Sequence, residues 1–260
     1  MAMNRTAVVT GGGQGIGRAV ALALGARGDA VVVCGRTEET LQSVVDEIHQ
    51  SGGRALALVA DMRSAESVEA LFAEVFSRYD AVGVLVTCAV KSRVAGFMEL
   101  SDEDWLGHYE TKVLGAVRCI RQVVPGMSRQ GWGRIVNLGG TSARSVADGR
   151  ITNGMTNAAI TNIGRHLAQE FAGQGILVNT VHPGYTQTPR LTMIVDRMAT
   201  DAAVSFDEAQ QSLEASIGTG RFIQPCEIAD LILFLCSDSN RSITGQALAV
   251  DGGLGRAITY

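Results

Sequence analysis

The sequence predicts an α/β fold built on a doubly wound parallel sheet, and two observations support this. Short valine-rich apolar runs alternate with longer stretches of helical period, which is typical of a parallel sheet covered by helices on both faces. A glycine-rich segment, Thr10-Gly-Gly-Gly-Gln-Gly-Ile-Gly17, joins the first apolar run to the first helical stretch. We therefore expect one domain over residues 1–260.

Each element follows from the local pattern. Strands are predicted at residues 6–10, 30–34, 55–60, 82–88, 134–138, 177–181 and 247–250. Helices are predicted at residues 15–27, 38–51, 64–78, 101–127, 151–172 and 225–237. The segment 190–220 breaks this alternation with helical, methionine-containing sequence. Its place after a strand's carboxyl end suits a substrate lid, and an ordinary pair of packing helices is the alternative.

Composition narrows the possible functions. The chain has 260 residues, of which 46% are apolar and 18% charged, and a formal net charge of -4. It lacks the basic excess that nucleic-acid binding favours, and no apolar run approaches the roughly 20 residues that span a bilayer. The start of the chain has no charged leader followed by an apolar region. We therefore expect a cytoplasmic protein with a small-molecule substrate, and neither a nucleic acid nor a membrane as partner.

The cysteines do not indicate a metal site. There are five, an odd number, and they are widely spread without a Cys-x-x-Cys pair or a histidine at metal-ligand spacing. We expect mostly buried, reduced thiols and no bound metal.

The glycine-rich segment predicts a dinucleotide site. Glycines at a strand-to-helix turn let the backbone approach a pyrophosphate, whose charge meets the N–H groups and the dipole of the helix start. Gly35 and Arg36 follow the second predicted strand, where an NAD site would place an acidic residue for the ribose. A guanidinium at this place suits a 2′-phosphate, so NADP(H) is the predicted cofactor. An Arg36 that is merely solvated is the alternative.

Further segments accompany this one along the chain. They are Asp61-Met62, Trp105, Gly133-Arg-Ile-Val-Asn137, Asn179-Thr-Val-His-Pro-Gly184 with Thr188, and Ile243-Thr-Gly-Gln-Ala-Leu-Ala-Val-Asp-Gly-Gly253. Together they resemble the short-chain dehydrogenase/reductase family over nearly the whole chain. The resemblance implies a Rossmann-like sheet of about seven strands. It also implies a set of cofactor-binding residues: Thr10, Gly11, Gln14, Gly15, Ile16, Gly17, Arg36, Asp61, Met62, Ala89, Asn157, Pro183, Gly184, Thr186 and Thr188.

The same resemblance places four catalytic positions, and none holds the family's usual residue. Lys112 stands in place of an asparagine, and Gly140 stands in place of a serine. Asn153 and Asn157 stand in place of the tyrosine and the lysine. The turn that ordinarily reads Asn-Asn-Ala-Gly is Thr87-Cys-Ala-Val90. In the family the tyrosine supplies the proton and the lysine lowers its pKa, so nucleotide binding is expected to be intact while the usual proton donor is missing.

Three residues remain as catalytic candidates. A side-chain amide cannot release a proton, but Asn153 can donate a hydrogen bond to an oxyanion, and Asn157 can bond ribose hydroxyls. Lys112 is a new ionisable group that we expect to face the pocket, where it could polarise a carbonyl or pair with a carboxylate. A lysine that extends along the helix surface is the alternative.

Polar neighbours of these positions have weaker cases. Thr141 or Ser142 could place a hydroxyl in the serine position, although a loop-capping role is favoured. His108 lies one helical turn before Lys112 and could relay a proton, although a surface position is favoured.

The segments near the expected crevice mouth hold basic side chains, and two phenols lie elsewhere in the chain. Arg93, Arg144 and Arg150 could bind an acidic substrate, although solvated surface positions are favoured. Tyr109 or Tyr185, if it lay at the reacting centre, would restore ordinary ketone reduction.

Three functions therefore stay open. The favoured one is an NADP(H)-dependent oxidoreductase that acts on a carbonyl, enone or imine-like substrate with a non-standard active site. The alternatives are a catalytically silent NADP(H)-binding protein and a non-redox enzyme on the same fold. The resemblance also implies a homo-oligomer, a dimer or tetramer, and small residues at Gly115-Ala116 and Ala158-Ala159 permit close helix approach.

Overall fold

The structure is a computed structural model, and it describes residues 5–255. Seven parallel strands form one sheet in the order β3-β2-β1-β4-β5-β6-β7. The strands are β1 Thr6–Thr10, β2 Ala30–Gly35, β3 Arg54–Val59, β4 Val84–Thr87, β5 Gly133–Leu138, β6 Ile176–Pro183 and β7 Ala247–Val250. The predicted doubly wound parallel sheet is therefore confirmed, with strand ends that differ from the prediction by two residues at most.

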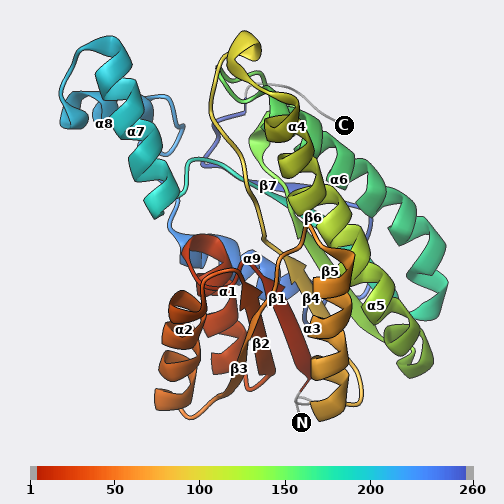
Figure 1. Cartoon of the computed structure of the whole chain (residues 1–260). Coiled ribbons are helices and arrows are strands. Elements are labelled where there is room, and N and C mark those ends of the chain that lie inside the picture. The colour runs from red at the N-terminus through yellow and green to blue at the C-terminus, as the bar shows by residue number, and fades with distance from the viewer. Residues whose placement is uncertain (1–4, 256–260) are drawn as a thin grey trace.

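Helices cover both faces of this sheet (Figure 1). They are α1 Gly15–Ala26, α2 Glu38–Gln50, α3 Ala65–Arg78, α4 Asp102–Tyr109, α5 Gly115–Gln130, α6 Ile151–Phe171, α7 Pro189–Ala202, α8 Phe206–Ala215 and α9 Pro225–Leu235. One apolar cluster joins α1, α2 and α9 to one face, and a second joins α3, α5 and α6 to the other. The chain thus crosses over the sheet in two directions from its centre, between β1 and β4.

The predicted helix over residues 101–127 is not a single α-helix. It is α4, a π-helical turn η2 at Glu110–Leu114, and α5. A π-turn widens the helix by one residue and is often found at functional sites. Lys112 lies at the centre of this turn.

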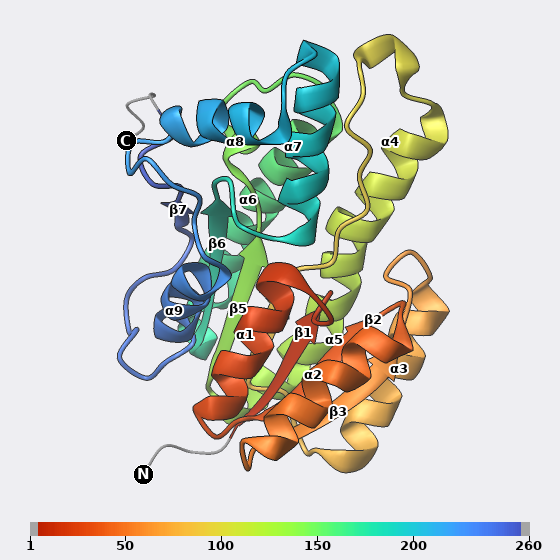
Figure 2. The ribbon, with the colours of Figure 1, turned by 90° about the vertical axis from the view of Figure 1, so that its left-hand side faces the viewer.

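The helices α7 and α8 stand beyond the carboxyl ends of the strands, apart from the two helical layers (Figures 1 and 2). Thr188 caps α7 through its hydroxyl, which accepts from the Leu191 N–H, and Pro189 occupies the first turn. The two helices share a small apolar cluster of their own that includes Leu191, Val195 and Leu213. The segment is therefore helical, as the sequence predicts.

Within the described residues, no helix combines the length and the apolar character needed to cross a membrane.

Candidate active site

The carboxyl ends of the central strands meet at one edge of the sheet. Thr10 pairs in register with Thr87, and Thr87 pairs with Asn137. The Thr10 hydroxyl oxygen accepts hydrogen bonds from the N–H groups of Cys88 (3.1 Å) and Ala89 (3.2 Å). The Thr87 hydroxyl donates to Asn137 Oδ1 at 2.8 Å in a fully buried contact. The two bonds to Thr10 hold the turn after β4 against the end of β1, and the Thr87 bond joins β4 to β5.

The glycine-rich turn lies beside this edge. Gly11 has a φ of +64°, which favours glycine, and its N–H donates to the Cys34 carbonyl at 2.7 Å. A Cβ on Gly17 would lie 2.2 Å from the Gly11 carbonyl oxygen, so only glycine allows α1 to begin this close to β1. The N-cap residue, Gln14, makes no side-chain bond to the first turn of α1. This helix start has the geometry of an anion-binding site.

A cavity of about 1420 Å³ joins the glycine-rich turn to α7. Of the predicted cofactor residues, those that line it are Gly11, Gln14, Gly15, Ile16, Gly17 and Thr188. Its other walls are the segment after β4, the loop before α6 and the inner side of α7. The predicted dinucleotide turn and the predicted lid segment therefore face the same space.

Lys112 lies beneath this cavity rather than on its wall. Its side chain is 9% exposed, and its Nζ donates to the Gly139 carbonyl at 3.1 Å. Burial and the positive charge of Arg190 lower the pKa of Lys112 to about 7, while Cys88 acts in the opposite direction. Gly139 follows Leu138, which lines the cavity as Cys88 does. The lysine is not the solvated surface residue that the alternative predicts, and it changes charge near neutral pH.

Asn157, on α6, contacts the loop that follows β5. It is 3% exposed, and its Nδ2 donates to the Ser142 hydroxyl at 2.9 Å. A Cβ on Gly140 would lie 2.6 Å from this Nδ2, so the asparagine fills the space that a serine at residue 140 would need. Asn157 Oδ1 is buried and has no hydrogen-bond partner within the described chain. An acceptor without a partner in this place fits a hydroxyl donor from a bound molecule.

Asn153 lies one turn earlier on α6. Its Nδ2 donates to the Ser92 hydroxyl at 3.3 Å, and its Oδ1 is also buried without a partner among the described residues. Ser92 lines the cavity, so Asn153 is one contact behind the wall. The structure thus brings all three catalytic candidates to one region under the cavity.

The expectation of a surface position for His108 is wrong. This side chain is 1% exposed, and its two ring nitrogens lie 3.1 Å from the Thr152 hydroxyl and 3.2 Å from the Thr156 hydroxyl. Burial is the main reason that the pKa of His108 falls to about 3, and Lys112 and Arg190 add to the effect. The imidazole is therefore neutral and engaged on both sides, which does not suit a proton relay.

His182 is a second buried imidazole beside the site, and it lies in the Asn179–Gly184 segment without having been predicted as a site residue. Its Nδ1 accepts from the Gly140 N–H at 2.9 Å, and its Nε2 lies 3.2 Å from the Thr161 hydroxyl. Burial and then the charge of Arg144 lower the pKa of His182 to about 4. A neutral ring can accept the Gly140 N–H, so His182 fixes the loop after β5.

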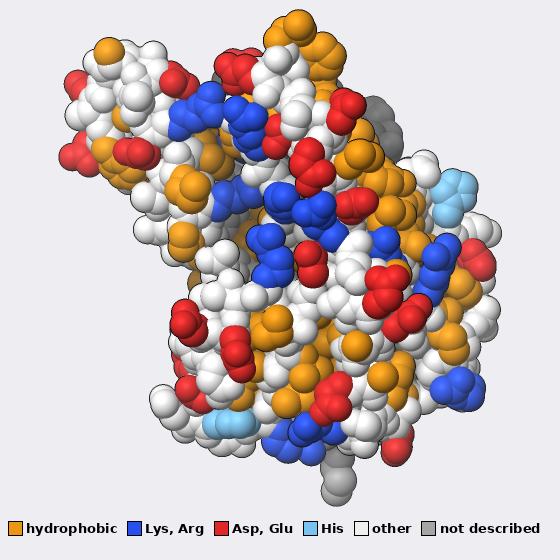
Figure 3. Space-filling view, viewed as in Figure 1, with side chains coloured by type: hydrophobic (Ala, Val, Ile, Leu, Met, Phe, Trp, Pro, Cys, Tyr) orange, Lys and Arg blue, Asp and Glu red, His pale blue; other side chains and the backbone are white. Residues whose placement is uncertain are grey.

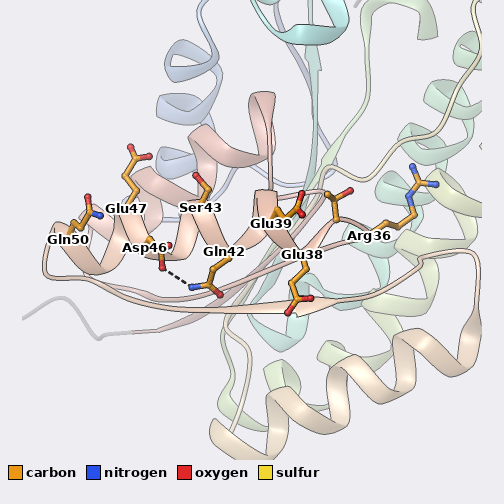
Figure 4. Close-up of a pocket in the computed structure, with 9 residues that line it drawn as sticks. Arg36, Glu38, Glu39, Gln42, Ser43, Asp46, Glu47 and Gln50 are labelled. Carbon is orange, nitrogen blue, oxygen red and sulfur yellow. Dashed lines mark hydrogen bonds between the residues drawn. The ribbon is translucent and has the colours of Figure 1, made fainter.

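Arg36 follows β2 and Asp61 follows the neighbouring strand β3, so both lie at the same edge of the sheet. Arg36 is exposed and borders a shallow hollow along α2, whose other lining residues include the carboxylates Glu38, Glu39, Asp46 and Glu47 (Figure 4). The negative charge of these carboxylates repels phosphates from the hollow. The Arg36 guanidinium points away from the carboxylates in Figure 4. The hollow is therefore part of the exposed face of α2.

The remaining cofactor candidates do not line the cavity. The Asp61 carboxylate accepts a hydrogen bond from the Arg63 N–H at 2.9 Å. Met62 is buried against Gly115, and a Cβ added to Gly115 would lie 2.7 Å from the Met62 Cβ. In the loop after β6, the Thr186 hydroxyl donates to the Gly184 carbonyl at 3.1 Å, and the Thr188 hydroxyl donates to the Thr186 carbonyl at 3.2 Å. The other members of this group are Thr10, Ala89 and Pro183, all at or just after strand ends.

Sequence reasoning missed Ser92 and Arg190. The Ser92 hydroxyl accepts hydrogen bonds from Asn153 and from the Arg190 guanidinium. No sequence motif includes Ser92, so the sequence did not mark it as a site residue. Arg190 had one signal, its place just after Thr188 and Pro189 at a helix start. Of the three arginines singled out near the crevice mouth, Arg93 and Arg150 line the cavity, and Arg144 does not.

No cluster of three or more His, Cys, Asp or Glu side chains within residues 5–255 is placed to hold a metal ion.

Comparison with known proteins places this geometry in a family. The family model described as enoyl-(acyl carrier protein) reductase matches residues 11–255. The short-chain reductase protein NovJ of Streptomyces niveus is 34% identical over 247 residues, covering 95% of this chain and 92% of NovJ. The chain belongs to the short-chain dehydrogenase/reductase family. The resemblance predicted from the sequence motifs is thereby confirmed.

Other members of the family are similar over their full length. The 3-oxoacyl-acyl-carrier-protein reductase FabG of Staphylococcus aureus is 34% identical over 255 residues, covering 98% of this chain and 99% of FabG. A variant of the actinorhodin polyketide ketoreductase, solved with NADPH, superposes with a TM-score of 0.94. It is 35% identical, and the match covers 99% of this chain and 100% of the ketoreductase. A solved neighbour that holds NADPH supports the prediction of NADP(H) as cofactor.

Proposed function

We propose that this chain is an NADP(H)-dependent oxidoreductase that acts on a small carbonyl, enone or imine-like substrate with a non-standard set of catalytic residues. The observation that carries the proposal is the continuous cavity between the glycine-rich turn and α7, with Lys112 beneath its floor. The family's NADPH-bound ketoreductase supports the reaction class. The substrates in the relatives' names, ketoacyl and polyketide groups, are starting points for the search.

The residues at this edge fit NADPH, which when bound would supply a hydride to the substrate carbon. The helix start of α1 would hold the pyrophosphate through Thr10, Gly11, Gln14, Gly15, Ile16 and Gly17. Arg36 would hold the 2′-phosphate, and Asp61 with Met62 would hold the adenine. The buried Oδ1 of Asn157 would accept a ribose hydroxyl, and Ala89 would also contact the cofactor. The loop residues Pro183, Gly184, Thr186 and Thr188 would support the nicotinamide end.

Lys112 is the proposed proton source. Burial lowers its pKa to about 7, near the pH at which a general acid works best, and because Lys112 does not line the cavity its proton would pass to the substrate through a bridging water. Asn153 would keep one amide N–H for the developing oxyanion while its other N–H bonds Ser92. The phenol of Tyr185, which lines the cavity, is the competing donor that experiment must exclude.

Two further parts of the proposal concern the whole molecule. The segment 190–220 acts as the substrate lid of a single domain, which is supported by its separate apolar cluster and its place over the cavity. The chain assembles as a homodimer or homotetramer, which is supported by exposed apolar residues on α4 and α6, including Leu106 (56% exposed) and Ile151 (46% exposed).

The cofactor preference gives a direct prediction. Arg36→Ala is expected to weaken NADPH binding about tenfold to a hundredfold, because a charge-assisted hydrogen bond contributes roughly 1.5 to 3 kcal/mol. NADH binding should change little, because NADH has no 2′-phosphate. Titration calorimetry with each cofactor measures both constants, and equal losses for the two cofactors would refute the assignment.

The function itself is tested by turnover of NADPH against a panel of ketones, enones and imines. The proposal expects at least one class to be reduced. NADPH binding without turnover on any class would favour the silent nucleotide-binding protein. No NADPH binding at all would favour the non-redox enzyme.

A further inference from the structure

Four arginines line the cavity, and two of them have no acidic partner. Arg93 bonds Asp104 at 3.2 Å, and Arg197 bonds Asp201 at 3.4 Å. Neither Arg150 nor Arg190 forms an ion pair with any residue in the described part of the chain. Lys and Arg side chains also gather on the face between the α7–α8 segment and α4 (Figure 3). Two carboxylates, Asp148 and Asp201, also line the cavity, so its four guanidinium groups leave an excess of positive charge.

The two unpaired arginines are both half-buried. The Arg190 guanidinium donates to the Ser92 hydroxyl, and the Arg150 guanidinium lies 5.2 Å from the centre of the Tyr185 ring. Burial and the charge of Arg150 lower the pKa of Arg190. Two like charges withdrawn from water destabilise the protein unless an anion joins them.

We propose that Arg150 and Arg190 bind an anionic oxygen group of the substrate, a carboxylate or a phosphate. The planar guanidinium can present two parallel N–H groups to either oxyanion. The inference rests on the proposed function, because it names the class of substrate that this cavity takes. The reactive carbonyl would then lie beside Ser92, which joins Arg190 to Asn153.

The pyrophosphate of the cofactor is the other anion that this cavity would receive. It belongs at the glycine-rich turn, where the first N–H groups of α1 are directed. Arg190 is instead coupled through Ser92 to Asn153 on α6, and Arg150 is stacked on Tyr185. The pair is therefore placed for the substrate and leaves the cofactor site to the glycines.

The test compares a keto acid with its neutral ester in the NADPH-loaded protein. Acetoacetate is expected to bind at least about tenfold more tightly than methyl acetoacetate, because only the acid gains the charge-assisted bonds. Arg150→Gln and Arg190→Gln should each remove most of this preference. Arg93→Gln is the matched control, since Arg93 lines the same cavity but already pairs with Asp104. Calorimetry measures the affinities without turnover.

Each outcome of this test bears on the proposal. Inorganic phosphate that displaces acetoacetate from the wild type, but not from the Gln variants, would identify phosphate as an equally good group. Equal binding of acid and ester, or no binding of either at millimolar concentration, would overturn the proposal. Arg190→Gln that weakens NADPH binding and keeps the preference for the acid would assign Arg190 to the cofactor. If the wild-type protein prefers acetoacetate to the ester but never turns over NADPH, the proposed function is refuted and the anion site stands.

Discussion

Lys112→Gln is expected to lower kcat for NADPH-dependent reduction by about 10²- to 10⁴-fold, the usual effect of losing a general acid. Glutamine is one bond shorter than lysine and keeps a polar N–H donor, but it cannot release a proton. KM should change little, because Lys112 lies beneath the cavity and not on its wall. Steady-state kinetics on the best substrate of the panel measures both constants.

Two control variants separate charge from proton transfer. Lys112→Arg keeps the positive charge but releases no proton at any working pH, so its kcat should also fall. Tyr185→Phe removes the one phenol that we have placed on the cavity wall, and its kcat should match the wild type. Unfolding curves of each variant establish that the losses do not arise from misfolding.

Gly17→Ala is expected to weaken NADPH binding strongly, with a dissociation constant raised by about a hundredfold, equivalent to roughly 2.7 kcal/mol. The new methyl group would lie 2.2 Å from the Gly11 carbonyl oxygen, so the glycine-rich turn must move away from α1. Overpacking of this kind also lowers the free energy of unfolding by about 1 to 3 kcal/mol. Calorimetry with NADPH and denaturant titration measure the two effects.

Gly173→Ala is the matched control for this change. A Cβ there meets no heavy atom within 4 Å, so cofactor binding should be unchanged and the free energy of unfolding should shift by less than about 0.5 kcal/mol. Normal NADPH binding by folded Gly17→Ala would show that the turn does not hold the pyrophosphate.

The layered fold could be predicted from sequence because the strands are short apolar runs, and the central strands β1, β2 and β4 are buried and rich in valine. β1 and β7 were predicted with their observed ends, and the glycine-rich turn marked the start of α1. The π-turn at Glu110–Leu114 could not be predicted. A π-turn has no distinctive local sequence, and the helix beyond it is fixed by a distant contact, in which Gly115 passes close to Met62.

The candidate site was predictable only where a motif marks the residue. The positions of Lys112, Asn153 and Asn157 followed from the family's spacing, but their partners did not. Thr152 and Thr156 lie 44 and 48 residues from His108 along the chain, so nothing local indicated that the histidine is buried. The contact between Asn157 and Gly140 also joins residues distant in the sequence, because the Asn157 amide occupies the space beside the Gly140 Cα.

The pH dependence of kcat/KM for NADPH-dependent reduction tests the central claim, that Lys112 replaces a phenol as proton donor, most directly. The protonated ammonium is the active form of a general acid, so the wild-type rate should be high below pH 7 and fall as the pH rises through about 7. In Lys112→Gln this step should be absent and the remaining rate low. A wild-type rate that stays level through neutrality, falls only near the pKa of a phenol at about 10 and is lost in Tyr185→Phe would contradict the account.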